Sequence, residues 1–211
     1  MDTNARALIL IFCRNAVKGR VKTRLAATVG DDEAFRIYEL LCDRTIDAIR
    51  TSAAERAVCY DSFLVEEDRW SAHVSHKRVQ IEGDLGVRLF EAFDWAFSQG
   101  FGKVVVIGTD CPGLSGGHLD SAIEALDRYD AVIGPAADGG YYLLGLKQTV
   151  PELFCNKNWG GDAVFRDTVA DLQRADRSCF RLPVLHDVDR EEDLIHLAGN
   201  GNRPSAQPPI A

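Results

Sequence analysis

Short apolar runs recur along this chain and are separated by stretches that have the periodicity of helices. The runs are rich in valine, isoleucine and leucine, which is typical of strands buried inside a parallel sheet. Seven runs predict strands: residues 7–13, 56–60, 78–81, 103–107, 130–134, 141–144 and 179–182. The apolar pattern therefore predicts a sheet as the centre of the molecule.

The stretches between the strands predict helices. Asp31 and Asp32 are placed to cap a long helix, and residues 83–86 open another with Val87, Phe90, Phe93 and Phe97 along one side. Further helices are expected at residues 119–126, 163–172 and 190–197. Strands that alternate with helices predict an α/β fold, a three-layer α/β/α sandwich around a mostly parallel sheet. We expect residues 1–198 to form one domain and residues 199–211, rich in glycine, proline and polar residues, to form a flexible tail.

Composition and charge narrow the class of protein. The chain has 211 residues, of which 46% are apolar, enough to bury the core of one domain. The formal net charge of −8 argues against nonspecific binding of nucleic acid. Six cysteines show no C-x-x-C pair and no metal-ligand spacing with the five histidines, so we expect reduced thiols and a cytoplasmic protein. No apolar window is long enough to predict a membrane span.

Three acidic clusters lie far apart in the sequence. Asp110 directly follows the strand predicted at 103–107, Asp138 precedes two glycines, and Asp187 and Asp189 stand in H-D-V-D. A carboxylate just past the carboxyl end of a strand lies where open α/β sheets bind ligands. Asp110, Asp187 and Asp189 are thus candidate ligands of Mg²⁺ or Mn²⁺, because hard cations prefer oxygen. The alternative is that Asp110 caps the helix or turn that follows it, and that Asp189 caps the helix that begins near Arg190, a role that could coexist with metal binding.

A cationic loop follows the first predicted strand. Five lysines and arginines fall within eleven residues, at positions 14, 18, 20, 22 and 24. Gly19 would let the backbone approach an oxyanion, and Arg14, Lys22 and Arg24 could neutralise phosphate charge. The loop has neither the Walker nor the Rossmann glycine pattern. Phosphate binding and a solvated surface loop are about equally favoured by composition alone.

Two glycine-containing segments could contact other parts of a ligand. Gly83, Asp84 and Arg88 stand at a helix start and could bind a nucleotide, although the segment alone favours a simple N-cap by Asp84. The segment Asp138, Gly139, Gly140 and Tyr141 could contact a second substrate or form a hairpin turn. Trp159 could stack on a ring or seal the core. The residues themselves leave each of these alternatives open.

Five segments together resemble one known family: G-R-V-K-T-R-L-A (19–26), G-D-L-G-V-R (83–88), I-G-T-D-C-P (107–112), G-P-A-A-D-G-G-Y-Y-L-L-G-L (134–146) and D-V-D-R-E-E-D-L (187–194). The chain resembles the uncharacterised bacterial proteins called DUF2064, within the nucleotide-diphospho-sugar transferase superfamily. The resemblance covers residues 7–197 and implies the glycosyltransferase-A fold, a mixed seven-stranded sheet with a nucleotide over its N-terminal half. Trp159-Gly160-Gly161 replaces the usual W-S-T, and Arg190 replaces a common threonine.

The resemblance also implies roles for the candidate residues. Asp110 would be the acidic metal ligand, completed by Asp187 and Asp189. Lys22 and Arg24 would face phosphates, and Asp138 would be an acceptor-binding residue or a general base. The remaining implied contacts are Gly83, Asp84 and Arg88 in the nucleotide pocket and Gly139, Gly140, Tyr141 and Trp159 on the acceptor side.

The resulting hypothesis is a transferase that uses Mg²⁺ or Mn²⁺, a nucleotide donor and a small-molecule acceptor. Glycosyl transfer from a nucleotide-diphospho-sugar is preferred. The first alternative is a nucleotidyltransferase that joins a nucleoside triphosphate to a small phosphorylated substrate and releases pyrophosphate. The second is a nucleotide-binding regulator without turnover. No nucleic-acid partner is expected, and formation of a homodimer is left open.

Overall fold

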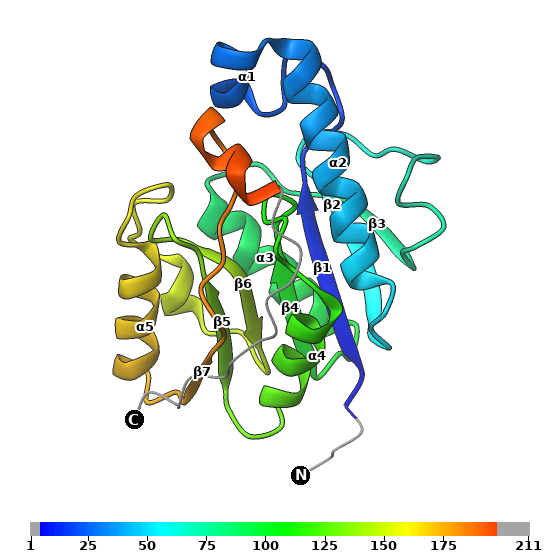
Figure 1. Ribbon diagram of the computed structural model, residues 1–211. Coiled ribbons are helices and arrows are strands. Elements are labelled where there is room, and N and C mark those ends of the chain that lie inside the picture. The colour runs from blue at the N-terminus through cyan, green and yellow to red at the C-terminus, as the bar shows by residue number, and fades with distance from the viewer. Residues whose placement is uncertain (1–4, 198–211) are drawn as a thin grey trace.

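The computed structural model describes residues 5–197, and its centre is one seven-stranded sheet (Figure 1). In spatial order the strands are β3 (His76–Val79), β2 (Glu55–Tyr60), β1 (Ala7–Cys13), β4 (Lys103–Ile107), β6 (Tyr141–Leu146), β5 (Ala131–Pro135) and β7 (Cys179–Arg181). Strand β6 is antiparallel to both of its neighbours, and every other pair is parallel. The mixed, mostly parallel sheet is therefore confirmed.

Helices cover both faces of the sheet (Figure 1). Helices α2 (Asp31–Ile49) and α4 (Gly116–Ala125) pack on the face formed by side chains such as Ile9 and Ile11. Helices α3 (Leu85–Ser98), η1 (Pro151–Phe154) and α5 (Val164–Arg174) pack on the opposite face, formed by side chains such as Leu8 and Leu10. Because successive residues of β1 point to opposite faces, this fully apolar strand contributes to both cores, and the three-layer sandwich is confirmed.

The chain returns across the molecule after β7. We call residues 182–197 the C-terminal strap; it runs from the β7 edge back to α1 (Thr23–Val29) and α2 and ends in the 3₁₀ helix η2 (Glu191–Leu197) (Figure 1, orange). A third apolar cluster fixes it there, with Val188 of the strap packed among Leu25, Ile37 and Leu41. The strap therefore brings the last described residues next to the first loop of the chain.

Several predicted elements differ from the structure at their ends. Helix α1 was not predicted, and β3 begins at His76 rather than Arg78. Gly30, not Asp31 or Asp32, is the N-cap of α2; the two aspartates lie in its first turn, where carboxylates favour the positive end of the helix dipole. The last helix is a 3₁₀ helix. The shifts at the α2 cap and at β3 are of one or two residues, which is common at the ends of elements.

The buried face of α3 also differs from the prediction. Val87 and Phe90 are 45% and 37% exposed, whereas Leu89 and Phe93 are buried. The helix is rotated so that Gly86 rather than Val87 meets the core. An added Cβ at Gly86 would lie 2.2 Å from the carbonyl oxygen of Phe154, so only glycine permits this close packing against η1.

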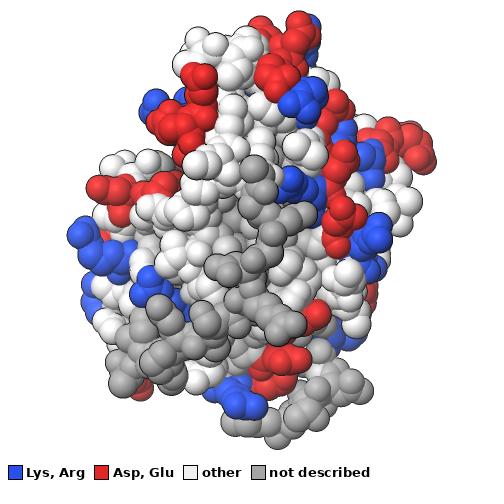
Figure 2. Space-filling model, in the orientation of Figure 1, with Lys and Arg blue, Asp and Glu red and all other residues white. Residues whose placement is uncertain are grey.

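Acidic and basic side chains are intermingled on the face shown in Figure 2. Within residues 5–197, no helix is long and apolar enough to cross a membrane. The predicted tail, residues 199–211, lies outside the described residues.

Candidate functional site

A cleft opens at the carboxyl ends of β1 and β4, where the strand order of the sheet reverses. Such a topological switch point is the usual place for a ligand in an open α/β sheet. The cleft has a volume of about 790 Å³. Its lining includes the charged residues Arg14, Lys22, Arg24, Arg88, Asp110 and Asp189. Six residues that the sequence singled out separately therefore lie around one space.

Other lining residues were missed by sequence reasoning. Asp61 and Gln80 directly follow the ends of β2 and β3, and Thr109 comes two residues after the end of β4. All three line the cleft. The rule that identified Asp110, a polar residue just past the carboxyl end of a strand, would also have found Asp61 and Thr109, whereas Gln80 lies inside the strand predicted at 78–81. Tyr38 comes from the middle of α2, and no sequence signal predicts its place. Its hydroxyl donates to the carbonyl oxygen of Arg14 at 2.5 Å.

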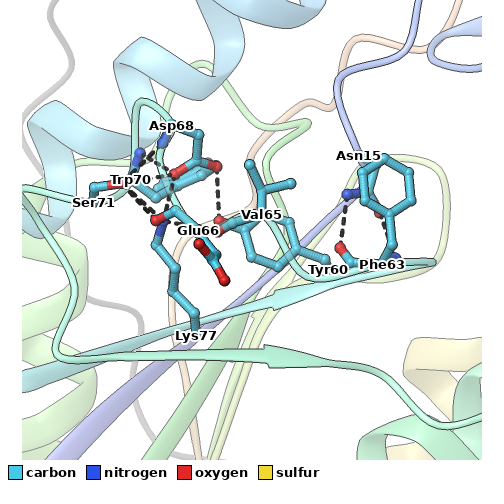
Figure 3. A network of polar contacts seen from close by, with 9 residues as sticks. All are labelled: Asn15, Tyr60, Phe63, Val65, Glu66, Asp68, Trp70, Ser71 and Lys77. Atoms are coloured by element: carbon cyan, nitrogen blue, oxygen red, sulfur yellow. Dashed lines mark hydrogen bonds and ion pairs between the residues drawn. The ribbon is translucent and has the colours of Figure 1, made fainter.

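The cleft residues Asp61 and Ser62 belong to the connection between β2 and β3, and polar contacts hold this connection in place (Figure 3). Lys77 Nζ donates to Asp68 Oδ1 at 2.9 Å, and Tyr60 donates its hydroxyl proton to the same carboxylate at 2.7 Å. Asn15, from the loop after β1, donates to the carbonyl oxygen of Phe63 at 2.9 Å and accepts from its amide at 3.1 Å. The loop after β1 and the connection between β2 and β3 are therefore held together.

The predicted nucleotide-pocket residues divide between two roles. Asp84 Oδ1 accepts from the amide of Val87 at 2.9 Å, which confirms the N-cap interpretation. Arg88 donates from Nε to the carbonyl oxygen of Gly83 at 2.9 Å and lines the cleft. Gly19 has a φ of 77° and faces the Asp31 carboxylate, so it forms a turn outside the cleft lining.

Lys22 has an unusual place in the cationic loop. It is buried, and its backbone has the left-handed conformation with φ 48° and ψ 42° just before α1. Its ammonium lies 2.6 Å from Asp110 Oδ1 and donates to the carbonyl oxygen of Val188 at 2.6 Å. Arg24, by contrast, is exposed and pairs with Asp189 Oδ2 at 2.7 Å.

The strap brings the three acidic clusters together. The amide of Val188 donates to the carbonyl oxygen of Asp110 at 2.8 Å, and Ala137 donates to the carbonyl oxygen of Leu185 at 2.9 Å. Burial, helped by the nearby carboxylates of Asp110 and Asp138, raises the pKa of Asp187 to about 7. The positive charge of Lys22 works in the opposite direction. The ionised form of Asp187 is therefore disfavoured at this position, first by burial and then by the neighbouring carboxylates.

The acidic side chains in this corner are the candidate ligands of a metal ion. The donors are all carboxylates, which suits Mg²⁺ or Mn²⁺, and a cation would relieve the repulsion around Asp187. Among residues 5–197, however, no group of three or more His, Cys, Asp or Glu side chains is close enough to hold a metal ion. Asp110 is engaged by Lys22, and Asp189 by Arg24. The donor chemistry fits a hard cation, and binding would require these two carboxylates to turn.

The helix-capping roles considered for Asp110 and Asp189 are wrong. Ser115, not Asp110, caps α4, in a reciprocal arrangement with His118. At the start of η2, Asp193 rather than Asp189 accepts the free amides; its Oδ2 accepts from Asp189 at 2.9 Å and from Arg190 at 2.8 Å. Asp110 and Asp189 therefore remain candidates for ligand binding.

The segment around Asp138 is a hairpin turn between β5 and β6. Asp138 Oδ1 accepts from the amide of Gly140 at 2.9 Å, and Ala136 donates to the carbonyl oxygen of Gly140 at 3.0 Å. Gly139 has a φ of 93°, and an added Cβ would lie 2.1 Å from the carbonyl oxygen of Asp162. The hairpin interpretation is confirmed, and Asp138 is exposed at its tip.

Trp159 and Tyr141 pack on the α3 side of the sheet. Both are partly buried against the second core cluster. The Trp159 ring lies against the α3 backbone, since a Cβ at Gly86 would be 2.7 Å from Trp159 Nε1. Trp159 therefore helps to seal the core. The Tyr141 hydroxyl is buried and has no hydrogen-bond partner within the described residues.

Comparison with solved structures identifies proteins that share this fold. A proposed nucleotide-diphospho-sugar transferase from Desulfovibrio desulfuricans G20 is 32% identical, with a TM-score of 0.82 over 90% of this chain and 85% of that one. The 4-diphosphocytidyl-2C-methyl-D-erythritol synthase of Anaerococcus prevotii is 13% identical, with a TM-score of 0.55 over 92% and 95%. Rv0371c of Mycobacterium tuberculosis, in complex with manganese, is 14% identical, with a TM-score of 0.53 over 91% and 97%. The last two likenesses concern the fold alone.

Sequence comparison gives the family. No curated protein matches the chain. The family model of DUF2064, described as uncharacterized protein conserved in bacteria, matches residues 45–161, which is more than half of the chain. Together with the 32% identical structure, this match shows that the chain belongs to the DUF2064 family.

Proposed function

We propose that this protein is a transferase that binds a nucleotide-diphospho-sugar in the cleft between β1 and β4 and transfers its glycosyl group. One observation carries the proposal: Arg14, Lys22, Arg24 and Arg88 line the same cleft as Asp110. Cations and carboxylates that line one cleft suit a diphosphate that is bound together with a metal ion. The 32% identical protein from Desulfovibrio desulfuricans, itself a proposed nucleotide-diphospho-sugar transferase, supports the same reading.

The arginines would bind the part of the donor that leaves. As the glycosyl bond breaks, negative charge grows on the nucleoside diphosphate, and fixed guanidinium groups stabilise that charge. Removing one such contact typically costs about 3 kcal/mol of transition-state stabilisation, or roughly a hundredfold in rate. Arg14, Arg24 and Arg88 have this role in our proposal. Lys22 adds positive charge from its buried position.

Asp110 and Asp187, with Asp189, would hold Mg²⁺ or Mn²⁺. Such a cation supplies charge neutralisation to the phosphates when it is bound. Asp138 lies at the tip of the β5–β6 hairpin, near Asp187, and would orient the acceptor or take the proton from its hydroxyl group. Gly139, Gly140 and Tyr141 belong to the same acceptor side.

Nucleotidyl transfer is the second candidate. The observation that favours it is the dense cationic loop, in which Arg14, Lys22 and Arg24 all border the cleft. A nucleoside triphosphate carries more negative charge than a nucleotide sugar and would match this loop well. A phosphate oxygen of the acceptor would then attack the α-phosphorus, and pyrophosphate would leave against the cations.

Thermal shift tests these proposals. The protein is measured with nucleoside triphosphates and with nucleotide sugars, each with and without Mn²⁺. Stabilisation that needs Mn²⁺ and one nucleotide sugar, but not the matching triphosphate, is the expected result. A shift with a triphosphate alone would favour nucleotidyl transfer, and no shift with any nucleotide would contradict the site.

Two controls sharpen the experiment. Asp110→Asn should lose the Mn²⁺-dependent shift and keep its fold; an unchanged shift would remove Asp110 from the metal site. Product analysis with the stabilising donor separates an enzyme from a regulator, because a regulator binds its nucleotide without consuming it.

A further inference from the structure

A buried lysine links the first loop of the chain to the C-terminal strap. The Lys22 side chain is only 4% exposed. Its ammonium contacts Asp110 Oδ1 and the Val188 carbonyl oxygen, each at 2.6 Å. An ammonium has three N–H donors, so these two contacts leave one for any ligand. A phosphate could reach only this third N–H, on a buried side chain that two partners already hold in place.

We propose that Lys22 is a positioning residue, which holds Asp187 and Asp189 beside Asp110, and is not a direct phosphate ligand. What the three carboxylates bind is taken from the proposed function, on which this inference rests. The tether itself is a contact within the chain and can be tested without any nucleotide.

Val188 shows how the tether works. Its side chain is fully buried in the cluster with α1 and α2. Its amide donates to the carbonyl oxygen of Asp110 at 2.8 Å, and its own carbonyl oxygen accepts from Lys22. Every polar and apolar group of Val188 is thus engaged. Because Asp187 and Asp189 are its immediate neighbours, fixing Val188 fixes the positions of both acids.

The backbone of Lys22 agrees with this role. A left-handed conformation at a residue other than glycine is uncommon and persists where the surrounding structure enforces it. Arg24 provides the contrast within the same loop, since its side chain is 65% exposed and its partner Asp189 is 43% exposed. Arg24 can turn toward a phosphate at little cost, whereas Lys22 cannot turn without leaving the Val188 carbonyl oxygen unpaired.

Hydrogen exchange measured by mass spectrometry tests the tether in the full chain without ligand. In Lys22→Met, which keeps the length and burial of the side chain, amides of residues 185–189 should exchange about tenfold faster than in the wild type. Amides of β1 and β4 should be unchanged, and the matched control Arg24→Met should behave like the wild type. Wild-type protection of residues 185–189 in Lys22→Met would overturn the proposal.

A second variant guards against a simple folding defect. Lys22→Gln keeps one donor for the Val188 carbonyl oxygen and should show an intermediate increase in exchange. If both variants lose protection throughout β1 and β4, Lys22 supports the whole fold rather than the strap, and the proposal is wrong.

Titration with MnCl₂ alone adds a readout with a definite sign. If Lys22 contributed only its charge, removing it would tighten Mn²⁺ binding, because a competing cation is gone. If Lys22 positions the acids, Lys22→Met should bind Mn²⁺ about tenfold more weakly. Tighter or equal binding overturns the positioning role. Absence of Mn²⁺ binding in the wild type would instead contradict the proposed metal site, while the exchange experiment would still decide the tether.

Discussion

Asp187 illustrates the free-energy cost of one charged side chain at this site. Its carboxylate is half-buried, and its charge is opposed by Asp110 and Asp138 more than it is helped by Lys22. A site arranged only for stability would not place an aspartate there, since asparagine has nearly the same shape and no charge. An ionised aspartate at this position agrees with the cation site that we propose.

Asp187→Asn should consequently have two opposite effects. Without metal, the variant should be more stable than the wild type by roughly 1–2 kcal/mol at pH 8, because a buried charge is removed. With Mn²⁺, it should lose the stabilisation that the wild type gains. The folded-state pKa of Asp187 is raised, so its ionisation opposes folding, and the advantage should shrink as the pH falls toward 4. Urea unfolding at pH 4.5 and 8, with and without MnCl₂, measures both effects.

His118 makes a second prediction about pH. Burial lowers the pKa of His118, and its Nδ1 contacts the Ser115 hydroxyl at 2.7 Å in the cap of α4. The unfolded chain then binds a proton at higher pH than the folded chain does, so the contribution of His118 is fully present above about pH 6.5 and declines below it. The difference in unfolding free energy between wild type and His118→Gln should therefore narrow by up to about 1 kcal/mol from pH 7.5 to 5.5. A difference in unfolding free energy that does not change with pH would show that the protonation of His118 is not coupled to unfolding.

At the scale of elements, the strands were predictable and their assembly was not. The runs at 7–13 and 103–107 match β1 and β4 to the residue, because buried parallel strands are continuous apolar segments. Helix α1 escaped prediction since it is short and is stabilised by the strap, which lies far away in the sequence. Local periodicity carries no information about such contacts.

The candidate site, too, was predictable only in part. The positions of Asp110 and the cationic loop followed from their place after predicted strands. The ion pairs of Lys22 and Arg24 with the acids depend on the course of the strap and could not be foreseen. Asp84 and Asp138 illustrate a different limit, because each takes the simple turn or cap role that its local sequence also allowed.

Gly139 in the β5–β6 hairpin and Gly160 between η1 and α5 form a matched pair for substitution. Gly139 and Gly160 both have φ near 90°, but only Gly139 would place a Cβ against backbone, 2.1 Å from Asp162 O. Gly160→Ala should cost about 1 kcal/mol, the penalty of the left-handed backbone alone. Gly139→Ala should cost at least about 3 kcal/mol, because the turn must also move. Thermal denaturation of the two variants provides the comparison, and equal costs would contradict the close packing of the hairpin.

At the scale of the whole molecule, the site is assembled from both ends of the described chain. Arg14, Lys22 and Arg24 precede the second strand, whereas Asp187 and Asp189 follow the last one. The strap carries Asp187 and Asp189 back to the N-terminal loop, where Arg24 pairs with Asp189. Changes in the strap should therefore affect the N-terminal loop.

Ending the chain after Arg181 tests this dependence. The cluster around Leu25, Ile37 and Leu41 would lose Val188, which should lower stability by about 2–4 kcal/mol. Mn²⁺ binding should disappear together with Asp187 and Asp189. The outcome that would count against a shared site is a shortened chain that keeps both its melting temperature and its response to MnCl₂.

The strap also has a consequence for biosynthesis. All seven strands leave the ribosome before residues 182–197 do, and domains begin to fold as they are synthesised. A nascent chain can therefore form its sheet while Asp110 still lacks the neighbouring acids and Lys22 lacks its second partner. Competence to bind a ligand would then arise in a late, separate step of maturation, and chains released early would be folded yet inert.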